Sequence, residues 1–450
     1  MSDLTELTVA AASELIARKK LSPVELVRAL LDRIERVEPK VRAWARLLPE
    51  VALAEARRLE ELQVKGEFCG PLHGVPIGLK DIIFTAGVET AAGSEVLAGF
   101  VPGYDATVTA RLKAAGAIIL GKTVTTEFAM FEPGPTRNPW NPEHTPGGSS
   151  SGSAAAVAAR MCPAAFGSQT AGSILRPASY CGIVGLKPTY GRVSRHGVVP
   201  VSWTLDHVGP MTRTVADAAL LLKVVAGPDP KDPTTLLAPV DDYPAAVGRG
   251  AGGLRVGVPD RFFSELADDE SRRAYEAALT TLRELGLLIR PVRLPEAFEP
   301  LRDAHRTIMY AEAAAFHRDW FKKRPDDYRP RTRRIIRAGL LTSAPLYLRA
   351  QQVRTEAVRA MGRLFEEVDV LVTPTTPGPA PRGLDWTGDP AFNQPFSAVG
   401  FPAITVPAGL SGSGLPLGVQ FVARPFDEAT LFRVAAAFEA ATGLSLKPPV

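Results

Sequence analysis

Short apolar runs of strand length alternate with longer amphipathic segments along most of the chain. The runs are mostly rich in β-branched residues and are bounded by glycine, proline or aspartate, as strands are; they read VPIGLK, AIIL, LRVGV, VDVLVT, AITVPA and GVQFVA. Helical spacing of apolar residues is found over residues 23–38, 50–62, 106–115, 214–226 and 269–285. Because strands and helices alternate, we expect an α/β fold with helices flanking both faces of a mostly buried mixed sheet.

The first of these helices has a clear start signal at Ser22-Pro23-Val24-Glu25. The Ser22 side chain can cap the third amide, proline suits the first helical position, and Glu25 can bond back to Ser22. A proline at position 39 disfavours a helix through the preceding residue, so we expect the helix to end at about Glu38.

The composition is that of a folded protein of ordinary charge. Of 450 residues, 46% are hydrophobic, and 52 basic against 48 acidic residues leave a net charge of +4. That charge is too small and too dispersed for a nucleic-acid surface, so we expect no direct nucleic-acid partner. We find no long linker-like run and no internal repeat. We therefore expect one domain over residues 1–450, with a variable, mainly helical subregion at about 227–350.

The N-terminal segment and the cysteines bear on location and redox state. The first residues, MSDLTELTVAAASEL, are acidic where a secretory signal would be positive, and they lack a continuous apolar stretch. No 18 apolar residues run together, so we expect no membrane span and a cytoplasmic location. Cys69, Cys162 and Cys181 are too few and too scattered for a disulfide framework or a zinc site. We expect reduced, mostly buried thiols and neither a metal nor a cofactor.

Two clusters rich in glycine and serine form the densest signal in the sequence. TPGGSSSGSAAAVAAR begins at Thr145, and FGSQTAGSILRPASYCGIVGLKPTYGR follows it after a predicted helix and the start of a short strand. Glycines at 147, 148 and 152 allow positive φ and close backbone approach. The Gly-Lys-Ser/Thr ending of a P-loop is absent. A flexible linker is the remaining alternative, which the apolar flanks disfavour.

Ser173, in the second cluster, is a candidate nucleophile. A serine hydroxyl needs a base within hydrogen-bond reach, and that base is usually histidine. None of the six histidines lies in an obvious Ser-His-Asp setting, and the local pattern A-G-S-I-L-R is not a G-x-S-x-G nucleophile elbow. The sequence therefore requires a different base.

Lys80 is the best candidate for that base. It ends the strand-like VPIGL run and precedes Asp81 at a strand-to-loop transition, where active-site groups often emerge. Burial lowers the pKa of a lysine, so a desolvated Lys80 can be neutral and accept a proton. The alternative is an ordinary lysine whose charged end lies in solvent.

The segments GVPIGLKD, GGSSSGSA, QTAGS and CGIVGLKPTYGR, in this order and spacing, resemble the amidase signature family. The likeness covers core motifs at residues 71–210 and returns in a C-terminal segment at 367–441. It implies the amidase signature fold and an enzyme that hydrolyses a linear amide C–N bond through an acyl-enzyme. The substrate would be a small-molecule amide, with carbamates or esters as side substrates, and the resemblance also implies a homodimer.

The resemblance also implies a role for each residue of a catalytic triad. Ser173 would be the nucleophile, Ser149 a bridging serine after a cis peptide that follows Gly148, and Lys80 the base. Neutral Lys80 would take a proton from Ser149, and Ser149 would take one from Ser173. The backbone amides implied as the oxyanion hole belong to Thr170, Ala171, Gly172 and Ser173.

The nucleophile segment departs from the usual family pattern at two linked positions. Most members read Asp-Thr-Gly-Gly-Ser-Ile-Arg, whereas Gln169 replaces the aspartate here and Arg176 lies three places after Ser173. Losing both members of a possible ion pair together avoids leaving one buried charge unpaired. The arrangement resembles malonamidase-type members, which implies that Arg176 binds a substrate carboxylate. A structural arginine paired with backbone carbonyls is the alternative.

Other functions stay open beside the amidase. The glutamine-hydrolysing A subunit of a tRNA-dependent amidotransferase shares the signature, and Arg354 resembles its glutamine-binding arginine. The expected aspartate has no clear counterpart, because Asp389 is nearest and lies offset. A non-catalytic scaffold is disfavoured because it would need neither Lys80 nor the two serines. Metal-dependent hydrolysis lacks an H-E-x-x-H or comparable ligand set.

Overall fold

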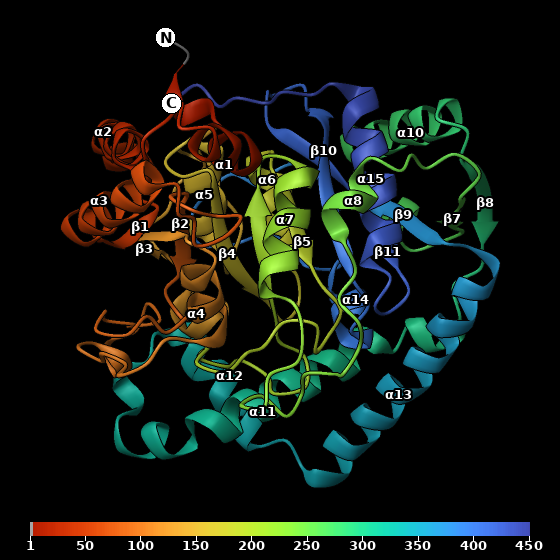
Figure 1. Ribbon diagram of the computed structural model, residues 1–450. Coiled ribbons are helices and arrows are strands. Elements are labelled where there is room, and N and C mark those ends of the chain that lie inside the picture. The colour runs from red at the N-terminus through yellow and green to blue at the C-terminus, as the bar shows by residue number, and fades with distance from the viewer. Residues whose placement is uncertain (1–2) are drawn as a thin grey trace.

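An 11-stranded mixed sheet forms the centre of the molecule in the computed structural model, which describes residues 3–450 (Figure 1). The strand order is β1-β3-β2-β4-β6-β5-β10-β11-β9-β7-β8. β2 pairs in parallel with β3 and β4, β7 pairs in parallel with β8 and β9, and the other pairs are antiparallel. The expected mixed sheet of an α/β protein is thereby confirmed.

The strands are short, as in most globular sheets. Their bounds are β1 Trp44–Leu47, β2 Pro76–Lys80, β3 Ile118–Thr123, β4 Ala164–Gln169, β5 Val184–Lys187, β6 His207–Thr212, β7 Arg255–Pro259, β8 Leu288–Val292, β9 Val370–Pro374, β10 Ala403–Leu410 and β11 Pro416–Ala423. All six apolar runs named from the sequence overlap strands. β7 and β8 belong to the subregion at 227–350, so this mainly helical segment also supplies one edge of the main sheet.

Fifteen α-helices surround the sheet in the part of the chain that the structure describes. Their bounds are α1 Val9–Ala17, α2 Pro23–Val41, α3 Pro49–Lys65, α4 Thr107–Ala114, α5 Ser151–Ala158, α6 Leu175–Cys181, α7 Val215–Val225, α8 Tyr243–Val247, α9 Phe263–Leu266, α10 Asp269–Glu284, α11 Leu301–Lys323, α12 Pro330–Leu340, α13 Ala344–Glu367, α14 Gln394–Val399 and α15 Glu428–Thr442. None of these helices is both long and apolar enough to cross a membrane.

Alternate residues of β4 show that both faces of the sheet are buried. Ala164 and Phe166 join a core cluster with α1, α4, α7 and α15, whereas Ala165 joins a second cluster with α2, α3, α5 and α6. Successive side chains of a strand point to opposite faces, so each face has its own helical cover. α5 consists of small residues that are buried all round, which lets it lie close to the sheet.

The expected end of α2 at Glu38 is wrong by one turn. The helix contains Pro39 and runs to Val41, and Arg42 ends it in the left-handed region at φ 56°. Val37 and Val41 are both buried in the core, and the Glu38 carboxylate accepts from the amides of Ala43 and Trp44. Packing of the last turn therefore outweighs the local preference against helix before proline. The capping box at Ser22 is present as predicted.

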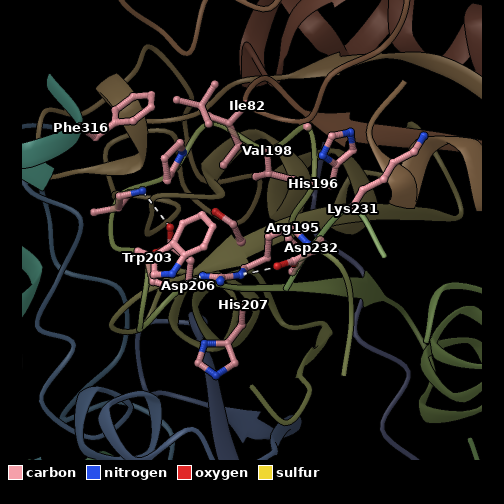
Figure 2. Close-up of a pocket in the computed structure, with 16 residues that line it drawn as sticks. Ile82, Arg195, His196, Val198, Trp203, Asp206, His207, Lys231, Asp232 and Phe316 are labelled. Carbon is pink, nitrogen blue, oxygen red and sulfur yellow. Dashed lines mark hydrogen bonds and ion pairs between the residues drawn. The ribbon is translucent and has the colours of Figure 1, made fainter. Parts of the chain in front are cut away.

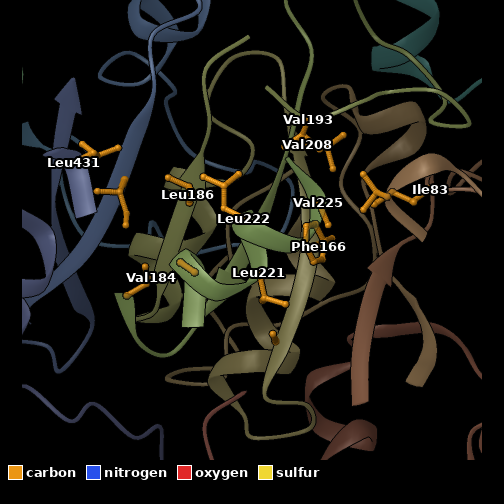
Figure 3. Packing of buried hydrophobic residues seen from close by; sticks show 14 of the residues in the cluster. Ile83, Phe166, Val184, Leu186, Val193, Val208, Leu221, Leu222, Val225 and Leu431 are labelled. Atoms are coloured by element: carbon orange, nitrogen blue, oxygen red, sulfur yellow. The ribbon is translucent and has the colours of Figure 1, made fainter. Parts of the chain in front are cut away.

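Leucines of α7 show how the sheet is covered at its centre. Leu221, Leu222 and Val225 of this helix lie over β4, β5 and β6, where Phe166 and Val184 face them (Figure 3). All five side chains are fully buried. The packing of α7 therefore covers β4, the strand that leads into the turn at Ser173.

We expect Leu222→Ala to destabilise the fold by about 2–5 kcal/mol, because the substitution leaves a cavity in a packed core. Leu237→Ala is the matched control, since Leu237 is 91% exposed and a surface change costs within about 0.5 kcal/mol. Urea unfolding followed by tryptophan fluorescence measures both. Equal unfolding midpoints for the two variants would contradict the packing described for α7.

Candidate active site

Lys80 is the last residue of β2, and its amine is fully buried between two hydroxyls. Its Nζ donates to Ser149 Oγ at 2.7 Å and to Ser168 Oγ at 2.9 Å. β2 lies between β3 and β4 with parallel pairing on each side, so the strand end is held rigidly. The alternative of a lysine with its charged end in solvent is therefore wrong.

The surroundings of the amine favour its neutral form. Burial holds the pKa of Lys80 well below its usual value, and the charge of Asp206 opposes this effect. A neutral amine carries a lone pair, so it can accept a proton from a neighbouring hydroxyl. The contact with Ser149 is the geometry that such a transfer needs.

Ser149 directly follows a tight turn that contains Gly147 and Gly148. The Gly148-Ser149 peptide bond is cis, as the family resemblance implied, and Gly147 has a φ of 81°. A Cβ on Gly147 would lie 2.7 Å from Pro177 Cα, so the backbone of this turn packs directly against the start of α6. The next amide, that of Ser150, donates to Ser173 O at 3.3 Å. The two serine segments are therefore joined through the main chain.

Ser173 lies in a tight turn that connects β4 to α6. Its side chain is 8% exposed, and no hydrogen bond among the described residues joins its hydroxyl to that of Ser149. In the same described part of the chain, the amides of Thr170, Ala171, Gly172 and Ser173 have no hydrogen-bond acceptor. Buried backbone N–H groups are almost always paired. Four unpaired amides in one turn are thus available to an oxyanion.

Side chains from two helices bind the carbonyl groups of this turn. Ser397 Oγ donates to Ala171 O at 2.7 Å, and His305 Nε2 lies 2.8 Å from Thr170 O. The Gln394 amide donates to His305 Nδ1 at 2.9 Å, so the Nε2 of this ring carries the hydrogen. Burial lowers the pKa of His305 to about 4, which keeps the ring neutral at physiological pH. These contacts from α11 and α14 fix the peptide groups of the turn, and with them the direction of its unpaired amides.

Gln169 fills the position where most family members have aspartate. Its Oε1 accepts from the amides of Ile174 at 2.8 Å and Leu175 at 3.0 Å. These amides lie at the start of α6, where an amide has no acceptor within the helix. Its Nε2 donates to Ser397 Oγ at 3.0 Å. The amide side chain therefore caps the helix that follows Ser173 without adding a charge.

Arg176 is buried and uses its guanidinium on the main chain. Its Nη1 donates to Gly388 O, and its Nη2 donates to Gly148 O, both at 2.6 Å, with Thr387 Oγ1 at 3.1 Å. Its Nε has no partner among the described residues. These contacts match the structural alternative left open by the sequence, because they fix the peptide before Ser149 against the loop at Thr387.

Arg354 and Asp389 are not joined in the part of the chain that the structure describes. Arg354, on α13, donates from Nε to Ala398 O at 2.6 Å and from Nη2 to Thr204 O at 2.7 Å. Asp389 accepts from the amide of Ala391 at 2.9 Å, a local turn contact. The arginine thus holds the segment around Thr204 against α14.

Two polar residues beside the relay were missed by the sequence reasoning. Ser168, the second acceptor of Lys80, directly precedes Gln169 in the cluster, so its place next to the nucleophile segment was a usable signal. Asp206 gave no such signal, because it lies in an ordinary loop and reaches the site only through folding. Both residues line one cavity of about 330 Å³ (Figure 2).

The cavity is mainly apolar with charged groups at its rim. Ile82, Val198, Trp203 and Phe316 form apolar walls, and the Arg195 guanidinium lies 5.4 Å from the centre of the Trp203 ring. The lining includes Ser168, the second hydrogen-bond acceptor of Lys80, but neither Ser149 nor Ser173. The cavity therefore adjoins Lys80 from the side of Ser168.

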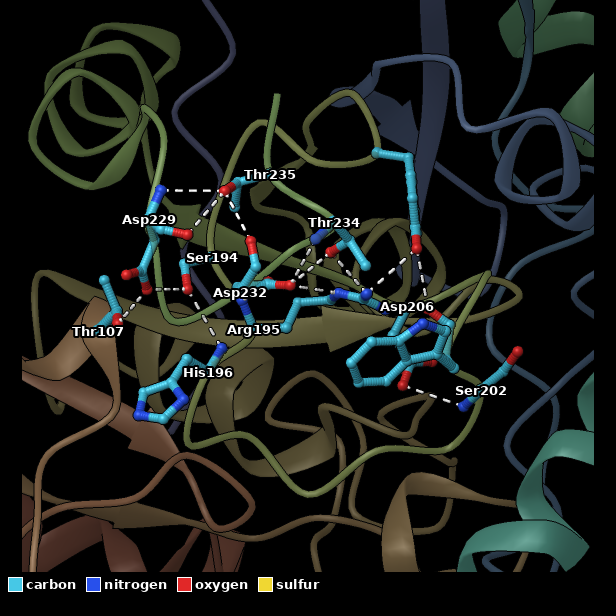
Figure 4. Close-up of polar contacts among 12 residues, drawn as sticks. Thr107, Ser194, Arg195, His196, Ser202, Asp206, Asp229, Asp232, Thr234 and Thr235 are labelled. Atoms are coloured by element: carbon cyan, nitrogen blue, oxygen red, sulfur yellow. Dashed lines mark hydrogen bonds and ion pairs between the residues drawn. The ribbon is translucent and has the colours of Figure 1, made fainter. Parts of the chain in front are cut away.

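A loop of aspartates and threonines braces this cavity (Figure 4). Asp229 accepts from Thr107 Oγ1 at 2.5 Å and from Ser194 Oγ at 2.6 Å. Asp232 accepts from the amide of Arg195 at 2.7 Å. The backbone that carries Arg195 and the next residues of the wall is thus fixed by side-chain oxygens.

No group of three or more metal-ligating residues is found among residues 3–450.

Comparisons with known proteins agree with the motifs and the fold. The family model described as Amidase matches residues 25–432. The A subunit of glutamyl-tRNA(Gln) amidotransferase from Geobacter metallireducens is 42% identical over 98% of each chain. A solved chain from a vestigial protein complex of an s-triazine catabolic enzyme is 33% identical, with a TM-score of 0.92 over 98% of this chain and 99% of that one. Peptide amidase from Stenotrophomonas maltophilia is 33% identical, with a TM-score of 0.87 over 98% of each chain. The chain therefore belongs to the amidase family, the amidase signature group that its motifs resemble.

Proposed function

We propose that this protein hydrolyses a carboxylic amide C–N bond through an acyl-enzyme on Ser173. The observation that carries this proposal is the buried amine of Lys80, 2.7 Å from Ser149 Oγ, with a pKa held well below its usual value by burial. The backbone contact between Ser150 and Ser173 brings the nucleophile segment beside this pair. A lysine in this setting replaces the histidine of other serine hydrolases.

The proposed reaction begins with a proton moving along two hydroxyls. Lys80 accepts a proton from Ser149, which takes one from Ser173 as the Ser173 oxygen attacks the carbonyl carbon. The amides of Ala171 and Gly172, with that of Ser173, stabilise the oxyanion. In a structure without substrate, catalytic hydrogen bonds are often long or unformed. The absence of a direct Ser173 to Ser149 bond among the described residues fits that state.

The second half of the reaction returns the proton to the leaving group. The Lys80 ammonium gives its proton back through Ser149 to the amide nitrogen, the C–N bond breaks, and the amine leaves. A water molecule then attacks the ester carbonyl, while the same relay takes its proton. Cleavage of the ester releases the acid and restores the Ser173 hydroxyl.

Glutamine is a specific candidate for the amide. Relatives over 40% identical along nearly the whole chain are named as the A subunit of glutamyl-tRNA(Gln) amidotransferase, and those names favour a glutamine-hydrolysing subunit over an independent amidase. The alignment with the Geobacter metallireducens protein runs over 480 positions, more than the 450 residues here, so that relative carries segments that this chain lacks. Arg354 binds main-chain carbonyls here, and a substrate carboxylate would have to displace them.

Arg176 supports the site by position more than by substrate contact. Its three hydrogen bonds hold the carbonyl of Gly148 and the loop at Thr387 together, so we propose that it fixes Ser149 in place. Binding of a substrate carboxylate would fit the unpaired Nε. A greater loss of turnover on an anionic amide than on a neutral amide in Arg176→Ala would favour that second role.

We expect a fluorophosphonate probe to label the wild-type protein at Ser173 and to leave Ser173→Ala unlabelled, because the probe traps an activated serine. Lys80→Met should slow labelling by about 10²- to 10⁴-fold, the usual contribution of a general base. Ser413→Ala is the control, because Ser413 is exposed in the turn that follows β10 and takes no part in the proposed relay. Labelling of folded Ser173→Ala at the wild-type rate would refute the assignment.

The rate of labelling should depend on pH through Lys80. The amine accepts a proton only when it is neutral, so the rate falls as pH drops below the pKa of Lys80 and reaches a plateau above it. Because burial lowers that pKa, the acid limb should lie well below the pH at which an ordinary lysine loses its proton. Stopped-time labelling across a pH series measures the acid limb. A plateau that extends down to about pH 5 would contradict a neutral lysine base.

Ammonia release from glutamine separates the two candidate functions. If the chain is the A subunit of an amidotransferase, ammonia release should rise when the other subunits of such an enzyme and tRNA(Gln) are added. An independent amidase should instead turn over small neutral amides alone, at a rate that the added subunits leave unchanged. Ser173→Ala serves as the blank in both assays. Both functions would be contradicted if the protein hydrolysed neither glutamine nor any of the small neutral amides tested.

A further inference from the structure

Asp206 is a buried carboxylate that the proposed relay does not itself use. It lies at the end of the loop before β6 and is 9% exposed. Its Oδ1 accepts from Thr170 Oγ1 at 2.5 Å, and its Oδ2 accepts from the amides of Val201 at 2.8 Å and Ser202 at 3.0 Å. Three donors therefore hold the carboxylate in one orientation, facing the cavity that Figure 2 shows.

The carboxylate and the Lys80 amine both bind hydroxyls at the end of β4. Lys80 contacts Ser168, and Asp206 contacts Thr170, two residues further on. Ser168 and Asp206 also line one cavity. Asp206 thus links the oxyanion turn to the surroundings of the lysine.

Few other charges act on this pair in the described part of the chain. Burial raises the pKa of Asp206, and Arg195 opposes this by stabilising its charged form. The adjacent His207 is neutral, since burial holds its pKa well below the usual value. Lys231 and Asp232 line the same cavity at its outer side.

A second buried lysine of the sheet, Lys122, points away from Lys80. Lys122 pairs with Leu79 in the β2-β3 register, so its side chain leaves the face of the sheet opposite to Lys80. Its Nζ lies 3.3 Å from Asp81 Oδ1 and donates to Thr90 Oγ1 at 2.7 Å. Its charge is therefore matched locally. Asp206 remains the charged group that opposes the effect of burial on Lys80.

We propose that Asp206 is a positioning residue, which fixes the oxyanion turn through Thr170 and supplies the negative charge against which the Lys80 amine takes up its proton. This inference rests on the proposed function of the relay. A buried ammonium without a counter-charge is costly. During attack, Lys80 becomes such an ammonium, and the fixed carboxylate stabilises it without any rearrangement.

The proposal predicts two linked effects of removing the charge. Asp206→Asn should move the acid limb of the labelling rate to lower pH, because Lys80 without the carboxylate is harder to protonate. The same variant should lower the plateau rate by about 10- to 100-fold, because the ammonium formed during attack loses a charged partner. Asparagine keeps one oxygen for the amides of Val201 and Ser202 and turns its amide group toward the Thr170 hydroxyl.

The experiment measures the rate of fluorophosphonate labelling at Ser173 between about pH 5 and pH 10. Asp217→Asn is the control, since it makes the same chemical change at a buried carboxylate that accepts from two amides, those of Val9 and Ala10, outside the site; it should leave the acid limb in place. Asp206→Ser is a second neutral replacement, whose hydroxyl can accept from the Val201 amide. It should move the limb in the same direction as Asp206→Asn. Melting curves establish that each variant is folded.

An unmoved acid limb in a folded, neutral variant at residue 206 would overturn the inference and leave the relay intact, since Ser173 is still labelled. An equal shift in Asp217→Asn would also overturn it, because the loss of any buried carboxylate would then have the same effect. A wild-type protein that is not labelled at Ser173 would instead remove the proposed function, and this inference with it. A shift confined to the two Asp206 variants supports the proposal.

Discussion

The whole site depends on the burial of one amine. Lys80 Nζ has two hydroxyls as hydrogen-bond partners among the described residues, and no water-exposed surface. Three strands produce this environment, because β2 carries the lysine, β4 carries Ser168 and leads into Ser173, and β3 closes the other side. A surface lysine would keep its proton at neutral pH. The position of β2 between two parallel neighbours is therefore a chemical requirement as well as a structural one.

The helices of the variable subregion and α14 support the same site from outside the sheet. His305 of α11 and Ser397 of α14 hold the carbonyls of the turn that carries Ser173. Glu312, also on α11, accepts from the hydroxyls of Ser202 and Thr204, in the loop that leads to Asp206. Changes in these helices would thus reach the oxyanion turn through defined contacts.

The sequence was informative where the pattern is local. Strands rich in β-branched residues, such as β9 and β11, were predicted, and so was the capping box of α2. β5 and β6 were missed because they contain glycine, and β6 also proline, which are uncommon in strands. Close packing explains one of these glycines, since a Cβ on Gly209 would lie 2.0 Å from Leu186 O. Lys80, Ser149 and Ser173 were singled out through motifs, and the structure brings their segments together. Asp206 and His305 were not singled out, because their contacts with Thr170 span 36 and 135 residues of sequence.

The edge strand β8 carries a consequence for how the molecule behaves in solution. It pairs with β7 on one side only, and in the described structure no strand lies beyond it. Its exposed residues are Leu288, Arg290 and Pro291. A proline offers no N–H to an incoming strand, and a charged side chain resists burial against one. The sheet can therefore end at β8 without recruiting a second molecule by strand addition, which protects a large open sheet from edge-to-edge aggregation.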